Sequence, residues 1–184
     1  LSVLGDQLIV ASDDAYGYEG VLHSVERTPQ GWPTYFSDDG VIASPFGAGG
    51  LFGRDLDFNE RWLVVSAPRV HGAQFVQTGA LAVYERVQGE WVLHSILGLP
   101  AGFEYGDVIW FGHGVAVHGN QIAASTFGGF CWDPTGQLRG GSVHFFEFHE
   151  ATGWSLTSSF EDLDPRPADE FGYSVDIHSR VAVV

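Results

Sequence analysis

A motif that repeats about every sixty residues constrains the fold of this chain more than any other feature of its sequence. The dipeptide Phe52-Gly53 recurs as Phe111-Gly112 and as Phe171-Gly172, at spacings of 59 and 60 residues. Further landmarks recur with the same period. Apolar runs cover 8–12, 63–68, 122–125 and 181–184, Gly-led apolar segments cover 20–27, 79–86 and 141–148, and a Trp follows at Trp32, Trp91 and Trp154. A period of this length is typical of a repeat architecture, in which each unit packs against the next.

Each repeat predicts four short β-strands. Its segments are rich in β-branched and aromatic residues and are joined by turn residues, and Gly accounts for 25 of the 184 residues. The order predicts a four-stranded antiparallel meander whose first strand follows the Phe-Gly pair and whose fourth strand begins at the Trp. One such sheet cannot bury both of its faces, and radial stacking of four-stranded blades gives a β-propeller. We therefore predict an all-β fold of propeller blades, with the Phe ring filling the space between blades and the Gly permitting close backbone approach.

The motifs resemble the FG-GAP repeat family. The resemblance rests on the Phe-Gly pairs, on the run 63–68 (Leu-Val-Val-Ser-Ala-Pro), on 79–86 (Gly-Ala-Leu-Ala-Val-Tyr-Glu-Arg) and on Gly89-Glu90-Trp91. The family includes the propellers of integrin α-subunits and many bacterial extracellular proteins. The resemblance implies a propeller that usually has seven blades and is exposed outside the cell.

The repeats divide residues 1–184 into about three blades. The predicted blades cover approximately 1–50, 51–110 and 111–170, and 171–184 would form the opening hairpin of a fourth. A propeller closes with about 4–8 blades. We therefore expect either a segment of a longer propeller or a ring that is completed when copies associate edge to edge.

Charge and composition exclude several function classes. All eight basic residues are Arg, there is no Lys, and 23 acidic residues give a formal net charge of −15. This charge disfavours a nucleic-acid backbone as partner, and the absence of Lys removes Schiff-base chemistry. The single Cys131 cannot form an intramolecular disulfide, and no apolar run approaches the roughly 20 residues of a membrane span.

The long predicted loops supply the candidate ligand-binding residues. In a four-stranded meander, the loops after second strands and the loops between blades lie on one face, and here these loops are long and varied, as binding loops usually are. We call this the loop face, and the opposite one, with the two- or three-residue turns after first strands, the short-turn face. The candidates are the aromatic residues and the carboxylate that stand out in the long loops: Tyr16, Tyr18, Phe75, Phe130, Trp132 and Asp133. Exposed aromatics near carboxylates suit sugar or peptide recognition, and the alternative is that they pack their own loops.

Metal and catalytic motifs receive no support from the sequence. In integrin-like members of the family a calcium loop of the type Asp-x-Asp-x-Asp-Gly follows the first strand, but here those turns are too short and carry too few carboxylates. Asp13-Asp14 and Asp38-Asp39 could contribute calcium ligands, but adjacent acids point apart in an extended chain, and we interpret them as solvated loop residues. His23 and His144 share one repeat position, and His118 and His178 share another. The other four of the eight His residues fall in a fourth strand, on loops or at a Phe-Gly motif, none of the eight is paired at metal-ligand spacing, and we interpret the histidines as surface residues. No Gly-x-Ser-x-Gly motif occurs, and no base or cation adjoins Cys131 in sequence.

The sequence therefore predicts a protein that is not an enzyme. We expect an extracellular or cell-surface adhesion module that binds a protein or glycan and has neither cofactor nor metal. An architectural or oligomer-forming element is the first alternative, and an accessory domain of a secreted enzyme is the second. The only asparagines, Asn59 and Asn120, do not begin glycosylation sequons, which favours a bacterial source.

Overall fold

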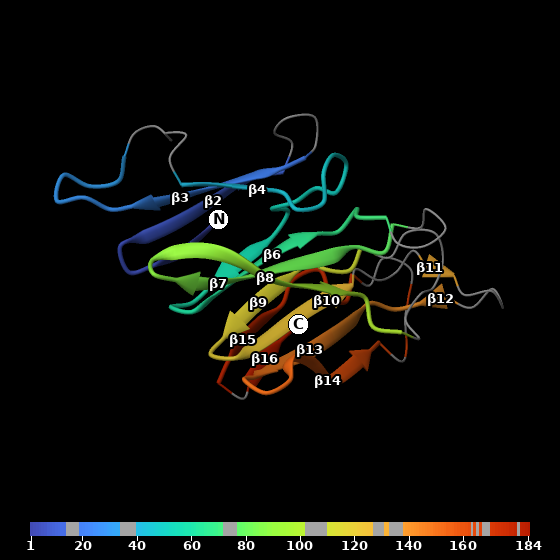
Figure 1. The fold of residues 1–184 in the computed structure, drawn as a ribbon. Helices are drawn as coiled ribbons and strands as arrows, with labels where there is room; N and C mark the ends of the chain where they lie inside the picture. Colours follow the sequence, from blue (N-terminus) through green and yellow to red (C-terminus); the bar gives the residue numbers. More distant parts are fainter. Residues whose placement is uncertain are drawn as a thin grey trace.

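The chain folds into stacked antiparallel β-sheets. The computed structural model describes residues 1–13, 19–33, 40–71, 77–101, 110–126, 131–132, 138–162, 164, 166, 170–179 and 181–184, and of 131–132 and 138–139 only the backbone. The described residues form sixteen strands and no helix. Figure 1 shows the sheets one below the other, from the N-terminal strands at the top to the C-terminal strands at the bottom.

Three sheets have four strands each, and each follows one repeat. Sheet 1 contains β1 (Ser2–Leu4), β2 (Gln7–Ser12), β3 (Val21–Glu26) and β4 (Val41–Ala43). Sheet 2 contains β5 (Leu56–Phe58), β6 (Trp62–Ala67), β7 (Ala80–Val87) and β8 (Glu90–Gly98). Sheet 3 contains β9 (Val115–His118), β10 (Gln121–Thr126), β13 (Ser142–His149) and β14 (Gly153–Glu161). The strands β15 (Asp176–His178) and β16 (Val181–Val183) form a hairpin, as the repeat predicts for 171–184.

Two details of the predicted strands are wrong. Trp91 and Trp154 lie in the fourth strands of sheets 2 and 3, but Trp32 lies in no strand, and the fourth strand of sheet 1 begins at Val41. Pro33 follows Trp32 directly, and a proline removes one backbone donor and restricts the residue before it. In addition, the predicted loop between the second and third strands of sheet 3 contains a hairpin of β11 (Cys131–Trp132) and β12 (Leu138–Arg139).

The hydrophobic core lies between successive sheets. Side chains alternate along β6: Trp62 and Val64 belong to a cluster with sheet 3, whereas Leu63 and Val65 belong to a cluster with sheet 1. All six residues of β6 are buried, because both faces of sheet 2 are covered. The outer strand β8 instead has only exposed and half-buried residues. Stacking of the sheets therefore buries the apolar faces that one sheet could not bury alone.

The repeated Phe and Gly residues meet where one sheet packs against the next. Phe52 and Phe111 are fully buried. A Cβ atom added to the Gly that precedes each third strand would collide with the carbonyl group of a Phe in the following repeat, in the pairs Gly20 with Phe52, Gly79 with Phe111, and Gly141 with Phe171. Gly20 and Gly79 also have positive φ angles of 79° and 80°. The Gly of the Phe-Gly pair also lies close to the preceding sheet, because a Cβ on Gly53 would lie 2.7 Å from Ala11 Cβ and one on Gly112 would lie 2.7 Å from Leu81 Cδ2. The predicted role of the Phe-Gly motif as a contact between sheets is confirmed at these two copies.

The first strands of successive sheets lie side by side. Strand β5 contacts β1 and β9, and β9 contacts β15. The carboxylates of Asp55 and Asp57 accept hydrogen bonds from the backbone N–H groups of Val115 and Val117, each at 2.8 Å. These bonds fix the register of β5 against β9, and therefore they fix how the loops of the two sheets meet.

Candidate functional site

A pocket of about 300 Å³ lies where the loops of the three sheets converge. Its walls come from the residue after β2, from the segments before β5 and β9, and from the segment after β6. The lining residues are Asp13, Leu51, Arg54, Pro68, Arg69, Trp110 and His113. All of them belong to loops after second strands or to connections between sheets, so the pocket is on the loop face. We call it the arginine pocket.

Arg69, Trp110 and His113 form one wall of the arginine pocket. The guanidinium carbon of Arg69 lies 5.5 Å from the ring centroid of Trp110. The rings of Trp110 and His113 are stacked, 6.2 Å apart and within 6° of parallel. The indole Nε1 of Trp110 donates to Gln77 Oε1 at 3.4 Å, and His113 Nδ1 lies 2.9 Å from the carbonyl oxygen of Tyr173. A carbonyl oxygen only accepts, so Nδ1 of His113 carries the hydrogen.

The arginine pocket is cationic in a strongly acidic chain. The Nε atom of Arg69 is buried and has no hydrogen-bond partner among the described residues. Arg54 is exposed, and one of its terminal nitrogens lies 3.9 Å from Asp13 Oδ2. Among the described residues, two arginines therefore line the pocket against one carboxylate, and the half-buried Arg69 pairs with no described acidic side chain.

A repeated backbone conformation positions two residues of the pocket. Leu51 and Trp110 directly precede the Phe-Gly motif and have φ angles of 53° and 52°, and Glu170 at the third copy has a φ of 55°. Left-handed backbone at a non-Gly residue costs about 1 kcal/mol or more, and it persists only where surrounding structure enforces it. A hydrogen bond from the Arg54 N–H to the Leu51 carbonyl closes the turn of the first copy. The motif that joins the sheets thus also shapes the wall of the pocket.

The predicted site residues fall almost entirely outside the described residues. Tyr16, Tyr18, Phe75, Phe130 and Asp133 lie in segments that the structure does not describe. Trp132 lies in β11 and pairs with Leu138 through the backbone. Their role in ligand binding remains a prediction.

Sequence reasoning missed four of the five polar and aromatic residues of the arginine pocket and named only Asp13. Arg54 and His113 each follow a Phe-Gly pair, Trp110 precedes one, and Arg69 follows the Ala-Pro sequence after β6. A usable signal was present: arginines are scarce in this chain, and these two sit directly beside repeat landmarks. The sequence analysis considered only aromatic residues and a carboxylate as site candidates and therefore passed over both arginines.

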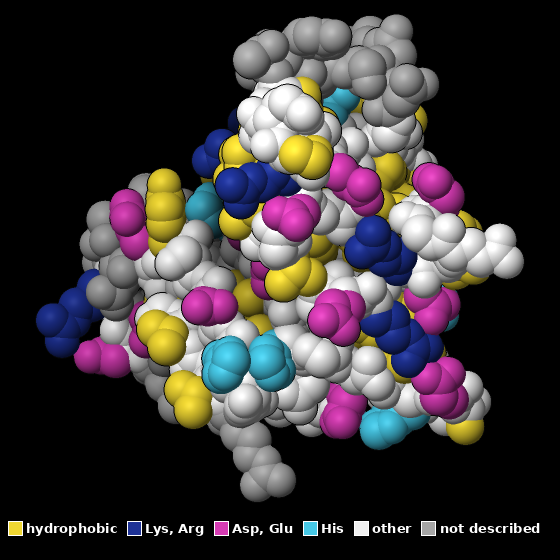
Figure 2. Space-filling view, turned by 90° about the vertical axis from the view of Figure 1, so that its left-hand side faces the viewer, with side chains coloured by type: hydrophobic (Ala, Val, Ile, Leu, Met, Phe, Trp, Pro, Cys, Tyr) yellow, Lys and Arg dark blue, Asp and Glu magenta, His cyan; other side chains and the backbone are white. Residues whose placement is uncertain are grey.

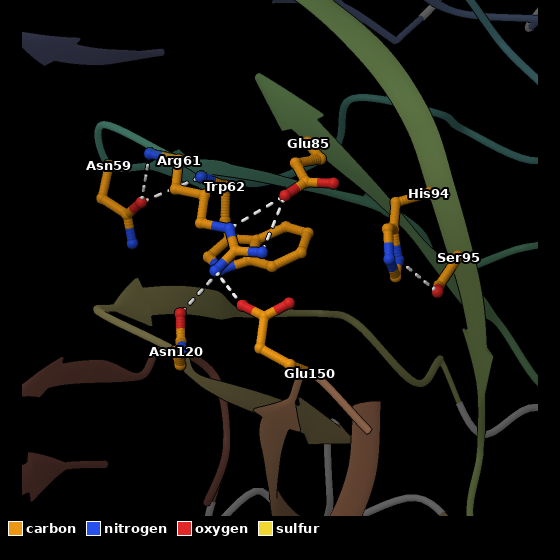
Figure 3. Close-up of polar contacts among 8 residues, drawn as sticks. All are labelled: Asn59, Arg61, Trp62, Glu85, His94, Ser95, Asn120 and Glu150. Atoms are coloured by element: carbon orange, nitrogen blue, oxygen red, sulfur yellow. Dashed lines mark hydrogen bonds and ion pairs between the residues drawn. The ribbon is translucent and has the colours of Figure 1, made fainter. Parts of the chain in front are cut away.

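On the short-turn face, Arg61 joins sheet 2 to sheet 3. Its Nε and one terminal nitrogen lie 2.9 and 2.8 Å from Glu85 Oε1, and its other terminal nitrogen lies 2.7 Å from Glu150 Oε1 (Figure 3). Its guanidinium carbon lies 4.7 Å from the Trp62 ring centroid and 4.9 Å from the Phe148 ring centroid. The hydrogen bond with Glu150 raises the pKa of Arg61, and the same bond lowers the pKa of Glu150.

Neighbouring hydrogen bonds make the Arg61 contacts a structural junction. Trp62 Nε1 donates to Asn120 Oδ1 at 3.0 Å across the two sheets (Figure 3). Asn59 Nδ2 likewise donates to the Gly119 carbonyl at 3.0 Å. All three guanidinium nitrogens of Arg61 already contact a carboxylate. Figure 2 shows Arg, acidic and His side chains interspersed on one side of the molecule, without a large patch of one sign. We therefore place the candidate site on the loop face.

The prediction that the histidines lie on the surface is wrong for His113, which is 9% exposed, and for His144. The His144 side chain is fully buried, with Nε2 at 2.8 Å from Ser142 Oγ and Nδ1 at 2.9 Å from Ser159 Oγ. Burial lowers its pKa to about 4. His118 and His178 occupy the same position in neighbouring repeats, as predicted, and their ring centroids are 4.5 Å apart. Within the described part of the chain, no three His, Cys, Asp or Glu residues are grouped to hold a metal ion.

Comparison of the sequence with known proteins does not assign it to a family. Neither a protein-family model nor a curated protein matches this sequence. Among the described residues, no helix is long and apolar enough to cross a membrane. Function is therefore inferred from the repeat, the arrangement of the sheets and the arginine pocket.

Proposed function

We propose that this chain is a non-catalytic ligand-binding or adhesion module, built from propeller blades of the FG-GAP type and exposed outside the cell. Its sheets form a frame, and its loop face contacts a protein or a glycan. The resemblance of the repeats supports the family and the location. The stacked antiparallel sheets and their side-by-side first strands are the arrangement that a propeller requires.

The arginine pocket is the observation that carries this proposal. Four separate loop segments, contributed by three sheets, converge on it. Concave sites with a few convergent polar groups are the usual form of ligand sites, and loops on a rigid scaffold usually supply them. The short-turn face differs, because the guanidinium of Arg61 is held there by two carboxylates and two aromatic rings.

Screening on peptide and glycan arrays tests the proposal. The wild-type protein should bind a subset of immobilised ligands, and Trp110→Ala in the arginine pocket should reduce that binding. Trp132→Ala and Tyr18→Ala test the predicted loop residues in the same format. Trp32→Ala is the matched control, because Trp32 is a partly exposed Trp outside the arginine pocket. Silence of the wild-type protein across both arrays would contradict a ligand-binding role.

An apolar groove favours the architectural alternative as a second candidate. A groove of about 600 Å³ lies between sheet 3 and the β15–β16 hairpin, and Phe145, Phe160, Ile177 and Val181 are among its lining residues. Phe160 is 59% exposed and Val181 is 64% exposed, which is unusual for large apolar side chains so close together. A further blade, from the same longer chain or from another copy, would cover these residues. Light scattering over a concentration series should show a defined oligomer if copies associate, and a monomer at every concentration would exclude association between copies.

A further inference from the structure

We infer that the arginine pocket recognises a carboxylate group of its ligand. The inference rests on the proposed ligand-binding function and adds the chemical class of the ligand that the pocket binds. Arg54 and Arg69 would donate to the carboxylate, because guanidinium groups present paired N–H donors that match its two oxygens.

The charge environment of Arg69 is the first argument. The chain carries 23 acidic residues against eight arginines, so an arginine readily finds a carboxylate partner. Among the arginines whose side chains the structure describes, Arg27, Arg54, Arg61 and Arg166 each lie within 4 Å of a described carboxylate, whereas Arg69 and Arg86 do not, and only Arg69 of these two lines the arginine pocket. Arg69 is half-buried, lines a pocket and pairs with no described carboxylate. Its buried Nε atom also has no hydrogen-bond partner among the described residues. A buried charge without a partner is costly, and a bound anion would supply the missing one.

The contact between Arg54 and Asp13 is the second argument. The nitrogen and oxygen are 3.9 Å apart, which is beyond hydrogen-bond distance, so the donors of Arg54 remain available to a ligand. Two arginines against one aspartate leave a single net positive charge among these three side chains. This balance suits a monoanion such as a carboxylate, because Asp13 would repel the second charge of a phosphate dianion.

The size and the walls of the pocket are the third argument. A volume of about 300 Å³ admits one acidic side chain or one sugar acid, and it lies at the small end of ligand pockets. Arg69 lies over the Trp110 ring, which holds its guanidinium plane. The hydrogen bond of His113 to the Tyr173 carbonyl fixes the ring stacked on Trp110. The cation is thus held in place before a ligand arrives, which reduces the entropy cost of binding.

Calorimetric titration with two acids and their neutral counterparts tests the inference. The probes are glucuronate, compared with methyl glucoside, and N-acetylglutamate N-methylamide, compared with the glutamine analogue, all at constant ionic strength. At least one acid should bind, and its neutral counterpart should bind at least about tenfold more weakly. Binding of glucuronate alone would assign the carboxylate to a sugar acid, binding of the glutamate derivative alone to a peptide, and binding of both to the carboxylate itself.

Variants separate this site from other cationic positions. Arg69→Gln should weaken binding of the acid at least about tenfold. Arg86→Gln is the matched control and should leave binding unchanged, since Arg86 is also half-buried and lies over a Trp, 5.6 Å from the Trp91 centroid, but does not line the pocket. Near-ultraviolet circular dichroism checks the fold of each variant. If Arg69→Gln fails to fold, Arg54→Gln, at an exposed side chain, decides in its place.

Several results would overturn the inference without touching the proposed function. These are binding of neither acid, equal binding of the neutral counterparts, or unchanged affinity in both Arg54→Gln and Arg69→Gln. An array ligand without a carboxylate that depends on Trp110 but not on Arg69 would overturn it as well. In each case the loop face could still bind a ligand, and only the chemical class assigned to that ligand would be wrong.

Discussion

The carboxylate of Asp57 accepts a hydrogen bond from the backbone N–H of Val117, sixty residues further along the chain and in the next sheet. The same carboxylate accepts hydrogen bonds from the Phe58 N–H and from Ser2 Oγ. One side chain therefore connects the first strands of three successive sheets. These hydrogen bonds hold β1, β5 and β9 side by side, and this arrangement brings the loop segments of the three sheets together.

Removal of this carboxylate should destabilise the protein. Asp57→Ala leaves the buried N–H of Val117 without its acceptor, and such a loss costs about 1–3 kcal/mol. Urea denaturation measures the free energy of unfolding. Asp164→Ala is the control and should change it by less than about 0.5 kcal/mol, because Asp164 and its partner Arg166 are both exposed. Equal effects of the two substitutions would contradict the proposed connection.

The Trp62 side chain should be among the most important contacts between sheets 2 and 3. It is fully buried, packs at 4.7 Å from the Phe148 centroid and donates to Asn120. Trp62→Ala should cost about 3–5 kcal/mol of unfolding free energy through lost contacts and a cavity. Trp32→Ala, at a side chain that is 38% exposed, should cost well under half as much in the same denaturation experiment. A small effect at Trp62 would mean that this interface is not packed as described.

His144 should make stability depend on pH between about 4 and 6.5. Burial lowers its pKa to about 4, whereas the unfolded chain takes up the proton near 6.5. The contribution is therefore fully present above pH 6.5 and is lost as the pH falls towards 4, by up to about 3 kcal/mol. Thermal denaturation across this range should show the slope in the wild type and a shallower slope in His144→Asn.

The exposed His71 provides the control for this pH dependence. His71→Gln should retain the wild-type slope. Burial raises the pKa of Asp55, which contributes with the opposite sign, but Asp55 is present in all three proteins and its effect cancels in the comparison. An identical slope in His144→Asn and the wild type would contradict the assignment.

Tyr84→Phe should stabilise the protein slightly. The side chain is 4% exposed, and its hydroxyl has no hydrogen-bond partner among the described residues. Burial accordingly raises the pKa of Tyr84. Removal of a buried hydroxyl without a partner should raise the unfolding free energy by up to about 1 kcal/mol. Tyr173→Phe, at a mostly exposed ring, should change it little, and a loss of stability in Tyr84→Phe would show that this hydroxyl has a partner.

The sheets could be predicted from the sequence alone because the same pattern of strands and turns recurs in each repeat. The Gly-led third strands and the Phe-Gly pairs could be aligned without coordinates, and the Phe-Gly pairs were predicted to lie between sheets. The close approach of Gly79 to Phe111 was not predicted and is seen only in the structure. The first repeat departed from the others where Pro33 follows Trp32. The proline restricts the backbone of the residue before it, so the fourth strand does not begin beside this Trp as it does in the other two repeats.

The candidate site was harder to predict because it is assembled over long sequence distances. Asp13, Arg69 and His113 approach one another only through the packing of three sheets. Prominent loop aromatics such as Tyr18 drew the prediction instead, since residue type was the only guide. His144 shows the same limit, because alternation along a strand does not reveal that a second sheet covers the outer face of that strand.

Two glycines in sheet 2 differ in how closely the next sheet approaches them. Gly79 and Gly89 have similar positive φ angles of 80° and 94°. A Cβ at Gly79 would collide with the backbone of Phe111, whereas nothing lies within 4 Å of a Cβ at Gly89. The two positions thus share the cost of left-handed backbone and differ only in the close approach of the next sheet.

Urea denaturation of Gly79→Ala and Gly89→Ala, measured side by side, therefore tests whether the repeat motif joins the sheets that frame the loop face. Gly89→Ala should lose about 1 kcal/mol of unfolding free energy from its φ angle alone. Gly79→Ala should lose more than about 3 kcal/mol, because the next sheet must also move. Equal losses at the two positions would show that sheet 3 does not pack against Gly79, and therefore that the repeat motif does not join the two sheets.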